Sequence, residues 1–470
     1  DRSPSRGLGD VYKRQIICGA GEVGYNIARL LSDEKNQITI IDHDEDRIEQ
    51  ISSKLDVRTL IGYASHPKIL KEAEADKSDM IIAVTQSDEI NMISCQIAST
   101  LFSVPIKIAR VRSEAYNMED WKHLFNEGLF SIDALISPEQ EVAKSFTRLV
   151  AVPGAKDLIS FDEDLVRLIE INLAEDCPVL NTPLNQLTEI FPDLGARVVY
   201  IVRNSEGFIP DKLSEMKSGD DIYIIAESTK TERVLSVFGK ETARARRIVI
   251  IGGGKTGLRV AKSIEDNEPQ SHITLIENNK NRAESIADEL SKSIILNGDA
   301  LDKEILEEAN IAKADFTFAL TASDEINTLS AILAKKYGCH SSAALLSENR
   351  YSPFINSLGI DAIVNPRELT VSRILRYVRK GKVFQVQSLR EGEAEVIELE
   401  AIESSILIGV PLREKPLPDG VAIGALIRDK SVILPTGSTT IEVGDRVIVF
   451  AKHDFITEIE KIFSVGIGFY

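Results

Sequence analysis

The stretch IICGAGEVG, residues 16–24, decides the fold, because it places three glycines in the spacing G-x-G-x-x-G directly after a short apolar run. Gly19 permits a tight turn, Gly21 lets a pyrophosphate approach the backbone, and Gly24 lets a helix pack on the strand. Apolar residues then recur at helical spacing up to Leu31. The stretch therefore predicts a strand, a turn and a helix whose first N–H groups bind phosphate.

An acidic residue completes the nucleotide motif. Asp42 ends the next apolar run, ITIID, 18 residues after Gly24, where a carboxylate binds a ribose 2′-hydroxyl. Because it would repel a 2′-phosphate, NAD or a plain adenosine ligand is favoured over NADP. The alternative is that the glycines only pack a sheet whose site is vacant.

The same pattern occurs a second time. VIIGGGKTG (249–257) repeats the glycine stretch, ITLIENNKNRAE (273–284) repeats ITIIDHDEDRIE (38–49), and ALTASDEIN (319–327) repeats AVTQSDEIN (83–91), at offsets of 233 to 236 residues. VNPRELTVSRI (364–374) repeats ISPEQEVAKSF (136–146). Glu277 takes the place of Asp42. So many matches in one register indicate an internal duplication.

Each copy continues into a smaller module. Pro210 and the pair Gly219-Asp220 recur as Pro435 and Gly444-Asp445, next to the alternating stretches DDIYIIAE and DRVIVFAK. Short alternating runs bounded by Gly and Pro are typical of β-strands. The predicted fold class is α/β: two doubly wound parallel-sheet, Rossmann-like domains, each followed by a small, mostly-β α+β domain.

The predicted boundaries follow this order. We expect a non-native or disordered tail (1–14), a first nucleotide-binding domain (15–135), a connector (136–154) and a first small domain (155–240). The second copy comprises a nucleotide-binding domain (246–365), a connector (366–382) and a small domain (383–470).

Further candidates lie near the predicted strand ends. Thr85 and Thr321 end the fourth strand of each copy, where ligands bind in such sheets, or else cap the following helix. Asp299 either hydrogen-bonds a ligand or caps a turn. Lys255 either reaches a phosphate or is a solvated loop lysine; GGGKTG does not fit a P-loop, whose first glycine would fall on Val249.

Arg110 distinguishes the two predicted sites. It ends the fifth strand of the first copy, whereas its partner in the second copy falls on Leu345 or Leu346. A fixed cation suits additional phosphate charge, so the first site is the better one for ATP or ADP. The alternative role for Arg110 is a surface ion pair.

Composition excludes several function classes. The formal net charge of −18 argues against nucleic acid as a partner. The four cysteines lie far apart, which favours reduced thiols over disulfides or a zinc site. No apolar run is long enough to span a bilayer. The six histidines do not cluster and no nucleophile motif is present, so we expect no catalytic and no metal-binding residues.

The ordered segments GAGEVG, VTQSDEINM, ARVRSEAY, ISPEQEVA, PGA, GGGKTG and LTASDEIN, with two GD-containing modules, resemble the TrkA family of Trk-type potassium uptake proteins over the chain after Gln15. The resemblance implies tandem RCK (KTN) domains, each with a TrkA-C module. It also implies a cytoplasmic, peripheral regulatory subunit on the inner membrane face. Four chains would form a ring that docks on a membrane pore of the Trk/Ktr type. NAD(H) and ATP/ADP would gate potassium uptake.

Carried over by position, the resemblance assigns ligand contacts to both copies. In the first copy these are Gly19, Ala20, Gly21, Glu22, Val23, Asp42, Thr85 and Arg110; in the second, Gly252, Gly253, Gly254, Lys255, Thr256, Glu277, Asp299 and Thr321. Gly24 and Gly257 complete the two motifs. Tyr63 departs from the family, where a small or polar residue is commoner. Two other functions stay open: a soluble NAD-dependent oxidoreductase, and a regulatory module of another cation transporter.

Overall fold

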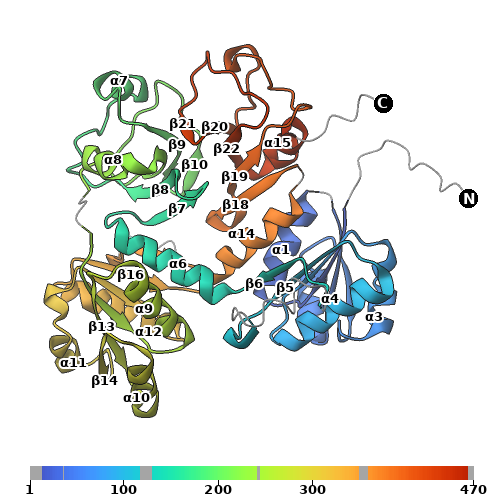
Figure 1. Ribbon diagram of the computed structural model, residues 1–470, viewed down its shortest axis with the longest axis horizontal. Coiled ribbons are helices and arrows are strands. Elements are labelled where there is room, and N and C mark those ends of the chain that lie inside the picture. Colours follow the sequence, from blue (N-terminus) through green and yellow to red (C-terminus); the bar gives the residue numbers. More distant parts are fainter. Residues whose placement is uncertain are drawn as a thin grey trace, which may run out of the picture. The chain divides into compact units, whose positions relative to one another are not determined.

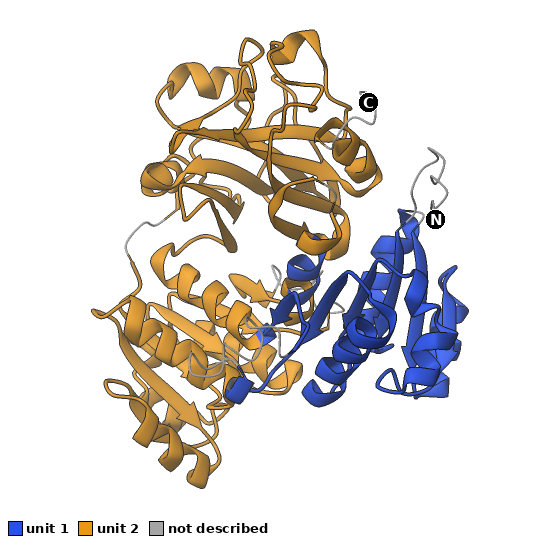
Figure 2. Cartoon of the chain, turned by 45° about the vertical axis from the view of Figure 1, so that its right-hand side comes forward, with its two compact units in different colours: residues 1–138, 370–375 blue, residues 139–369, 376–470 orange. Residues whose placement is uncertain are grey.

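The computed structural model describes residues 13–34, 36–116, 130–240, 244–348, 358–379 and 381–463 (Figure 1). The chain divides into two compact units, which are described separately (Figure 2). Unit 1 holds residues 1–138 and 370–375, and unit 2 holds residues 139–369 and 376–470. Unit 2 therefore holds most of the first predicted connector and both β modules besides the second α/β domain, and a short segment of the second copy groups with unit 1.

Unit 1 contains the first α/β domain. Its six strands form a parallel sheet in the order β3-β2-β1-β4-β5-β6, which is that of a dinucleotide-binding fold. The strands are β1 (Arg14–Cys18), β2 (Gln37–Asp42), β3 (Arg58–Ile61), β4 (Met80–Ala83), β5 (Ile106–Arg110) and β6 (Ala134–Ile136). The described helices are α1 (Glu22–Asp33), α2 (Glu45–Ser52), α3 (Pro67–Glu72) and α4 (Asp88–Phe102), with the 3₁₀ turns η1 (Ala75–Lys77) and η2 (Glu114–Tyr116).

The first strand begins earlier than its predicted boundary. Arg14, which the predicted tail includes, pairs with Gln37 at the start of β1. Residues 1–12 of that tail lie outside the described residues.

Unit 2 contains the second α/β domain, whose sheet has the equivalent order β14-β13-β12-β15-β16-β17. Its strands are β12 (Arg247–Ile251), β13 (His272–Glu277), β14 (Ile294–Asn297), β15 (Phe316–Ala319), β16 (Ser341–Leu345) and β17 (Ala362–Val364). Its helices are α9 (Lys255–Asn267), α10 (Lys280–Glu289), α11 (Lys303–Glu308) and α12 (Asp324–Lys336), with η5 (Ile311–Lys313). The predicted duplication of the parallel-sheet domain is confirmed.

Both small modules are five-stranded antiparallel sheets of one topology, β10-β9-β11-β8-β7 and β21-β20-β22-β19-β18. The first comprises β7 (Asp157–Phe161), β8 (Val166–Asn172), α7 (Leu184–Ile190), β9 (Ala196–Arg203), β10 (Glu206–Phe208), β11 (Asp221–Glu227), η4 (Ser228–Lys230) and α8 (Thr231–Val237). The second comprises β18 (Val383–Leu389), η7 (Arg390–Gly392), β19 (Ala394–Glu400), η8 (Leu412–Glu414), β20 (Val421–Arg428), β21 (Ser431–Ile433), β22 (Arg446–Lys452), η9 (His453–Phe455) and α15 (Ile456–Phe463). Side chains of both sheets, including Tyr200 and Phe450, share one buried cluster.

The repeated Gly-Asp pair has a structural role in each module. The carboxylate of Asp220 accepts two hydrogen bonds from the Arg203 guanidinium, at 2.8 and 2.7 Å. Asp445 accepts the same two bonds from Arg428, at 2.8 and 2.7 Å. Both carboxylates are almost fully buried, so the bidentate pairs compensate the loss of hydration.

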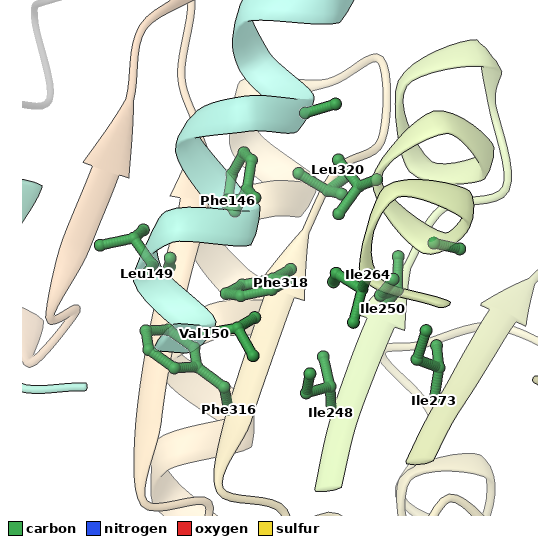
Figure 3. Packing of buried hydrophobic residues seen from close by; sticks show 14 of the residues in the cluster. Phe146, Leu149, Val150, Ile248, Ile250, Ile264, Ile273, Phe316, Phe318 and Leu320 are labelled. Atoms are coloured by element: carbon green, nitrogen blue, oxygen red, sulfur yellow. The ribbon is translucent and has the colours of Figure 1, made fainter. Parts of the chain in front are cut away.

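The two connector helices cross between the copies. α6 (Pro138–Ala151) comes from the first copy, yet its apolar face packs on the second α/β domain within unit 2. Figure 3 shows Phe146 and Val150 pointing toward Phe316 and Phe318. Conversely, residues 370–375 of α14 (Pro366–Val378) group with the first α/β domain in unit 1. Each predicted connector is therefore mostly helix; α6 packs on the sheet of the other copy, and part of α14 groups with the first α/β domain.

Candidate functional site

The first glycine turn has the geometry that the spacing predicts. Gly19 has a φ of +112°, which a residue with a side chain rarely adopts. A Cβ on Gly24 would lie 1.9 Å from the carbonyl oxygen of Gly19, so only glycine lets α1 pack this closely. A Cβ on Gly21, in contrast, would meet no atom within 4 Å. Gly21 is the N-cap of α1 and provides no side-chain cap, so this open face leads to the first N–H groups of the helix.

The second turn reproduces these relations. Gly252 has a φ of +100°, and a Cβ on Gly257 would lie 1.9 Å from the Gly252 carbonyl oxygen. Gly254 caps α9 without a side chain, and a Cβ on this glycine would again meet no atom within 4 Å. Lys255 and Thr256 are the first residues of α9, so Lys255 is an exposed helix residue. Glu22 and Val23 hold the equivalent positions in α1.

Each acidic residue lies against its glycine turn. The carboxylate of Asp42 accepts the N–H of Ala20 at 2.6 Å and the N–H of Asp44 at 3.0 Å. Glu277 accepts the N–H of Gly253 at 2.8 Å and that of Asn279 at 2.8 Å. A carboxylate has about four lone-pair positions, so each retains acceptor capacity for a ribose hydroxyl.

The two threonines belong to a repeated hydrogen-bond network, and neither caps a helix. Thr85 and Thr321 lie two residues beyond β4 and β15, and each hydroxyl donates to an asparagine Oδ1, on Asn91 and Asn327, at 2.7 Å. The helix caps are the serines two residues further on. The network holds the threonine backbone against the glycine turn, since a Cβ on Gly19 would lie 3.0 Å from the Thr85 nitrogen.

Arg110 ends β5 as predicted, but it is not a surface residue. It is 6% exposed, and its guanidinium donates to the carbonyl oxygen of Thr85 at 2.8 Å. Leu345 is its counterpart, because Asn91 donates to the Arg110 carbonyl and Asn327 to that of Leu345. The bond to the Thr85 carbonyl places its guanidinium near the glycine turn, while phosphate binding and an ion pair both stay predictions for Arg110.

A cation that sequence reasoning missed lies at the second turn. Nε of Arg282, on α10, donates to the carbonyl oxygen of Gly253 at 2.8 Å. Its counterpart Arg47 instead pairs with Asp44, at 3.3 Å. A comparison of the repeated segments shows the arginine in both copies, but only the structure shows the different partners.

The first site also carries an aromatic group at its rim. The rings of His43 and Tyr63 stack, with centroids 5.0 Å apart and planes 18° apart, and His66 lies beside Tyr63 at 5.4 Å. Nδ1 of His43 is 3.1 Å from the Asp42 carboxylate. The second copy has Asn278, Asp299 and Asp302 at these positions.

Asp299 has a local role that fits the predicted turn cap. Its carboxylate accepts the N–H of Leu301 at 2.9 Å, directly after β14. It is exposed, so ligand binding by its other oxygen stays a prediction.

The cysteine at the first turn has no nucleophilic character. Burial raises the pKa of Cys18 far above its usual range, and the charge of Asp42 raises it further. Burial raises the pKa of Cys95 in the same way. Since the thiolate is the reactive form, both residues act as small apolar core residues.

Family models match both α/β domains and the second β module, and relatives align over nearly the whole chain. The TrkA-N domain model matches residues 15–138 and 248–366, and the TrkA-C domain model matches residues 396–464. The Trk system potassium uptake protein TrkA of Azorhizobium caulinodans is 43% identical over 455 residues, covering 97% of this chain and 99% of the relative. The protein of the same name from Halomonas elongata is 37% identical over 459 residues, covering 97% and 99%.

Solved structures share the fold at low identity. The GsuK RCK domain aligns with a TM-score of 0.59 and 16% identity, covering 98% of both chains. The GsuK channel bound to NAD aligns with a TM-score of 0.59 and 15% identity, covering 96% of this chain and 79% of that one. With two TrkA-N matches, a TrkA-C match and relatives aligned over nearly their full length, this chain belongs to the TrkA family of Trk-system potassium uptake proteins.

Proposed function

We propose that this chain gates a Trk-type potassium uptake system by binding NAD(H) and ATP/ADP at its two glycine turns. Family membership makes it a regulatory subunit of a potassium system, and its relatives carry the name of an uptake protein, not of an enzyme. The oxidoreductase alternative is therefore set aside. The name of the relatives also favours potassium uptake over another cation transporter.

One observation carries the nucleotide part of the proposal. At Gly21 and at Gly254, a helix begins with an uncapped end and open space, next to a carboxylate at the end of the second strand. Phosphate oxygens accept hydrogen bonds from helix N-terminal N–H groups, and the helix dipole favours their negative charge. The GsuK channel, which shares this fold, has a structure bound to NAD.

The rims of the two sites support different ligands. The stacked rings of His43 and Tyr63 offer the first site a surface for an adenine base. Asp299 and Asp302 give the second rim negative charge, while Arg282 supplies a cation at the turn itself. We assign ATP/ADP to the first site and NAD(H) to either.

Gating requires that a ligand bind one conformation of the assembly better than another. A tenfold preference at one site is worth about 1.4 kcal/mol, and coupled sites multiply the effect. The proposed partner is a membrane pore subunit of the Trk/Ktr type, on whose inner face a tetramer of this chain binds. No helix in the described part of the chain is both long and apolar enough to cross a membrane.

The test compares two alanine variants with the wild-type chain. Gly21→Ala and Gly254→Ala place a methyl group where a phosphate would approach, and both glycines have φ values (−73° and −62°) that alanine adopts. We expect the melting temperature to stay unchanged and calorimetry to show at least about tenfold weaker binding of ATP, ADP or NADH. Potassium uptake by the pore should then lose its nucleotide response. Full binding and full regulation in the double variant would refute the proposal.

A further inference from the structure

We propose that a cationic pocket at the amino-terminal edge of the second parallel sheet, separate from both glycine turns, binds a small phosphate-bearing molecule. The pocket has a volume of about 410 Å³. The charged or ring-nitrogen side chains in its lining are those of Arg244, Arg247, Lys313, Asp315 and His340. Small-molecule sites begin at about 300 Å³, so the volume suits a compact ligand.

The pocket is distinct from the glycine turn of the same domain. Arg247 is the first residue of β12, whereas the turn begins at Gly252, directly after that strand ends. Five residues of extended chain span about 16 Å, which separates the two ends of the sheet. A ligand of the turn therefore does not reach this pocket.

The internal duplication provides a built-in comparison for the charges. In the first copy, Arg14 and Lys77 take the places of Arg247 and Lys313. There the carboxylate of Glu74 neutralises both, at 3.7 Å from Arg14 and 3.3 Å from Lys77.

The second copy lacks that carboxylate. Asn310 occupies the position of Glu74, before η5, with nearly the same backbone (φ of 54° against 57°). No ion pair is found for the side chains of Arg247 and Lys313 among the residues that the structure describes. The second copy therefore has both cations but not the carboxylate that pairs with both of them in the first copy.

Among the residues that the structure describes, the other acidic groups near the pocket form no ion pair with Arg247 or Lys313. Asp315 accepts the backbone N–H groups of Arg246 and Arg247, both at 2.8 Å, as Asp79 does for Arg14 in the first copy. The carboxylate of Glu268 forms an ion pair with the guanidinium of Arg244, at 3.5 Å. Glu268 therefore has a cationic partner of its own, while Asp315 keeps its negative charge in the lining, as Asp79 does at the equivalent position of the first copy.

One further nitrogen-bearing side chain, an imidazole, is present only in the second copy. His340 lines the pocket, whereas Pro105 precedes the equivalent strand of the first copy. In a chain of net charge −18, a pocket with three cationic side chains and an imidazole against the one carboxylate of Asp315 favours an anion over a neutral ligand. The planar guanidinium of arginine matches phosphate oxygens in geometry, and the lysine ammonium adds a compact positive charge.

The experiment titrates the full chain with inorganic pyrophosphate by calorimetry, in the Gly21→Ala/Gly254→Ala background so that the glycine turns do not contribute. Asn310→Glu restores the missing carboxylate at a position whose backbone the first copy shows to accept glutamate. Asn181→Glu is the matched control, since it makes the same change at another exposed asparagine of positive φ (56°), in the first β module.

We expect pyrophosphate affinity to fall at least about tenfold in Asn310→Glu and to stay within about twofold of the parent in Asn181→Glu. Arg247→Gln/Lys313→Gln should abolish the same binding step. A local readout is the His340 ring resonance by NMR, which should shift with pyrophosphate in the parent but not in Asn310→Glu. Equal losses in the Asn310 and Asn181 variants, or no saturable step in the parent, would overturn the proposal. Neither result bears on nucleotide binding at the glycine turns.

Discussion

Truncation of Phe146 tests whether the connector helices pack on the opposite copy, an arrangement called here the helix exchange. Phe146 belongs to α6, which follows the first α/β domain in sequence, but it is fully buried against the second domain. Its ring meets that of Phe318 at a centroid distance of 4.9 Å, in an edge-on arrangement of 61° (Figure 3). Phe146→Ala removes this ring from a closed core, which costs about 3–5 kcal/mol.

The test depends on which domain loses stability more than on how much stability is lost. We expect amide hydrogens in β12 and β15 to exchange about a hundredfold to a few thousandfold faster, since each 1.4 kcal/mol corresponds to a factor of about ten. Amides of β1 and β4 should stay protected. Hydrogen exchange read by mass spectrometry resolves the two domains by peptide.

The counterpart variant should show the reverse pattern. Ile374 occupies the position of Phe146 in the repeated segment, is fully buried, and groups with the first domain. Ile374→Ala should cost about 2–5 kcal/mol and deprotect β1 and β4. Faster amide exchange in β1 and β4 for Phe146→Ala, or in β12 and β15 for Ile374→Ala, would refute the helix exchange.

Three further predictions concern local features. Gly24→Ala should lower the melting temperature by several degrees, because its methyl would clash with the Gly19 carbonyl and overpacking costs about 1–3 kcal/mol; differential scanning calorimetry measures this. Burial raises the pKa of Glu368 to about 7, so its protonated form favours folding: the stability it contributes is complete below about pH 4.5 and lost as pH rises through about 7. Glu368→Gln should flatten that dependence in melting curves from about pH 5 to 8, whereas unchanged curves would contradict the role of burial. Tyr63→Ala should weaken ATP binding by about 0.5–1.5 kcal/mol in calorimetry, through loss of the stacked surface beside His43, and leave the second site unaffected.

The fold class and the position of the glycine turns were predictable from local sequence. A G-x-G-x-x-G stretch requires a backbone conformation and a close approach that only glycine allows, as the contact of Gly24 with Gly19 shows. The duplication is visible in the sequence alone, and the matching strand orders of the two parallel sheets and of the two antiparallel sheets confirm it. The acidic residues at the ends of β2 and β13 followed from spacing in the same way.

Partners of individual side chains were less predictable. Arg110 could be placed at the end of a strand, but its burial and its bond to the Thr85 carbonyl depend on how neighbouring strand ends meet. Thr85 was placed correctly near the turn, yet the helix cap falls on Ser87, because the cap depends on which hydroxyl reaches the N–H of Ile90.

Only the tertiary structure decided where the connector helices pack. Helical periodicity tells which face of residues 138–151 is apolar, but any exposed apolar sheet face would satisfy it equally. The sequence therefore determined that this protein carries two glycine-turn domains and two β modules. Packing determined that α6 covers the sheet of the other copy and that part of α14 groups with the first α/β domain, because burial of apolar surface is not directional and the choice of partner is made by shape and connectivity.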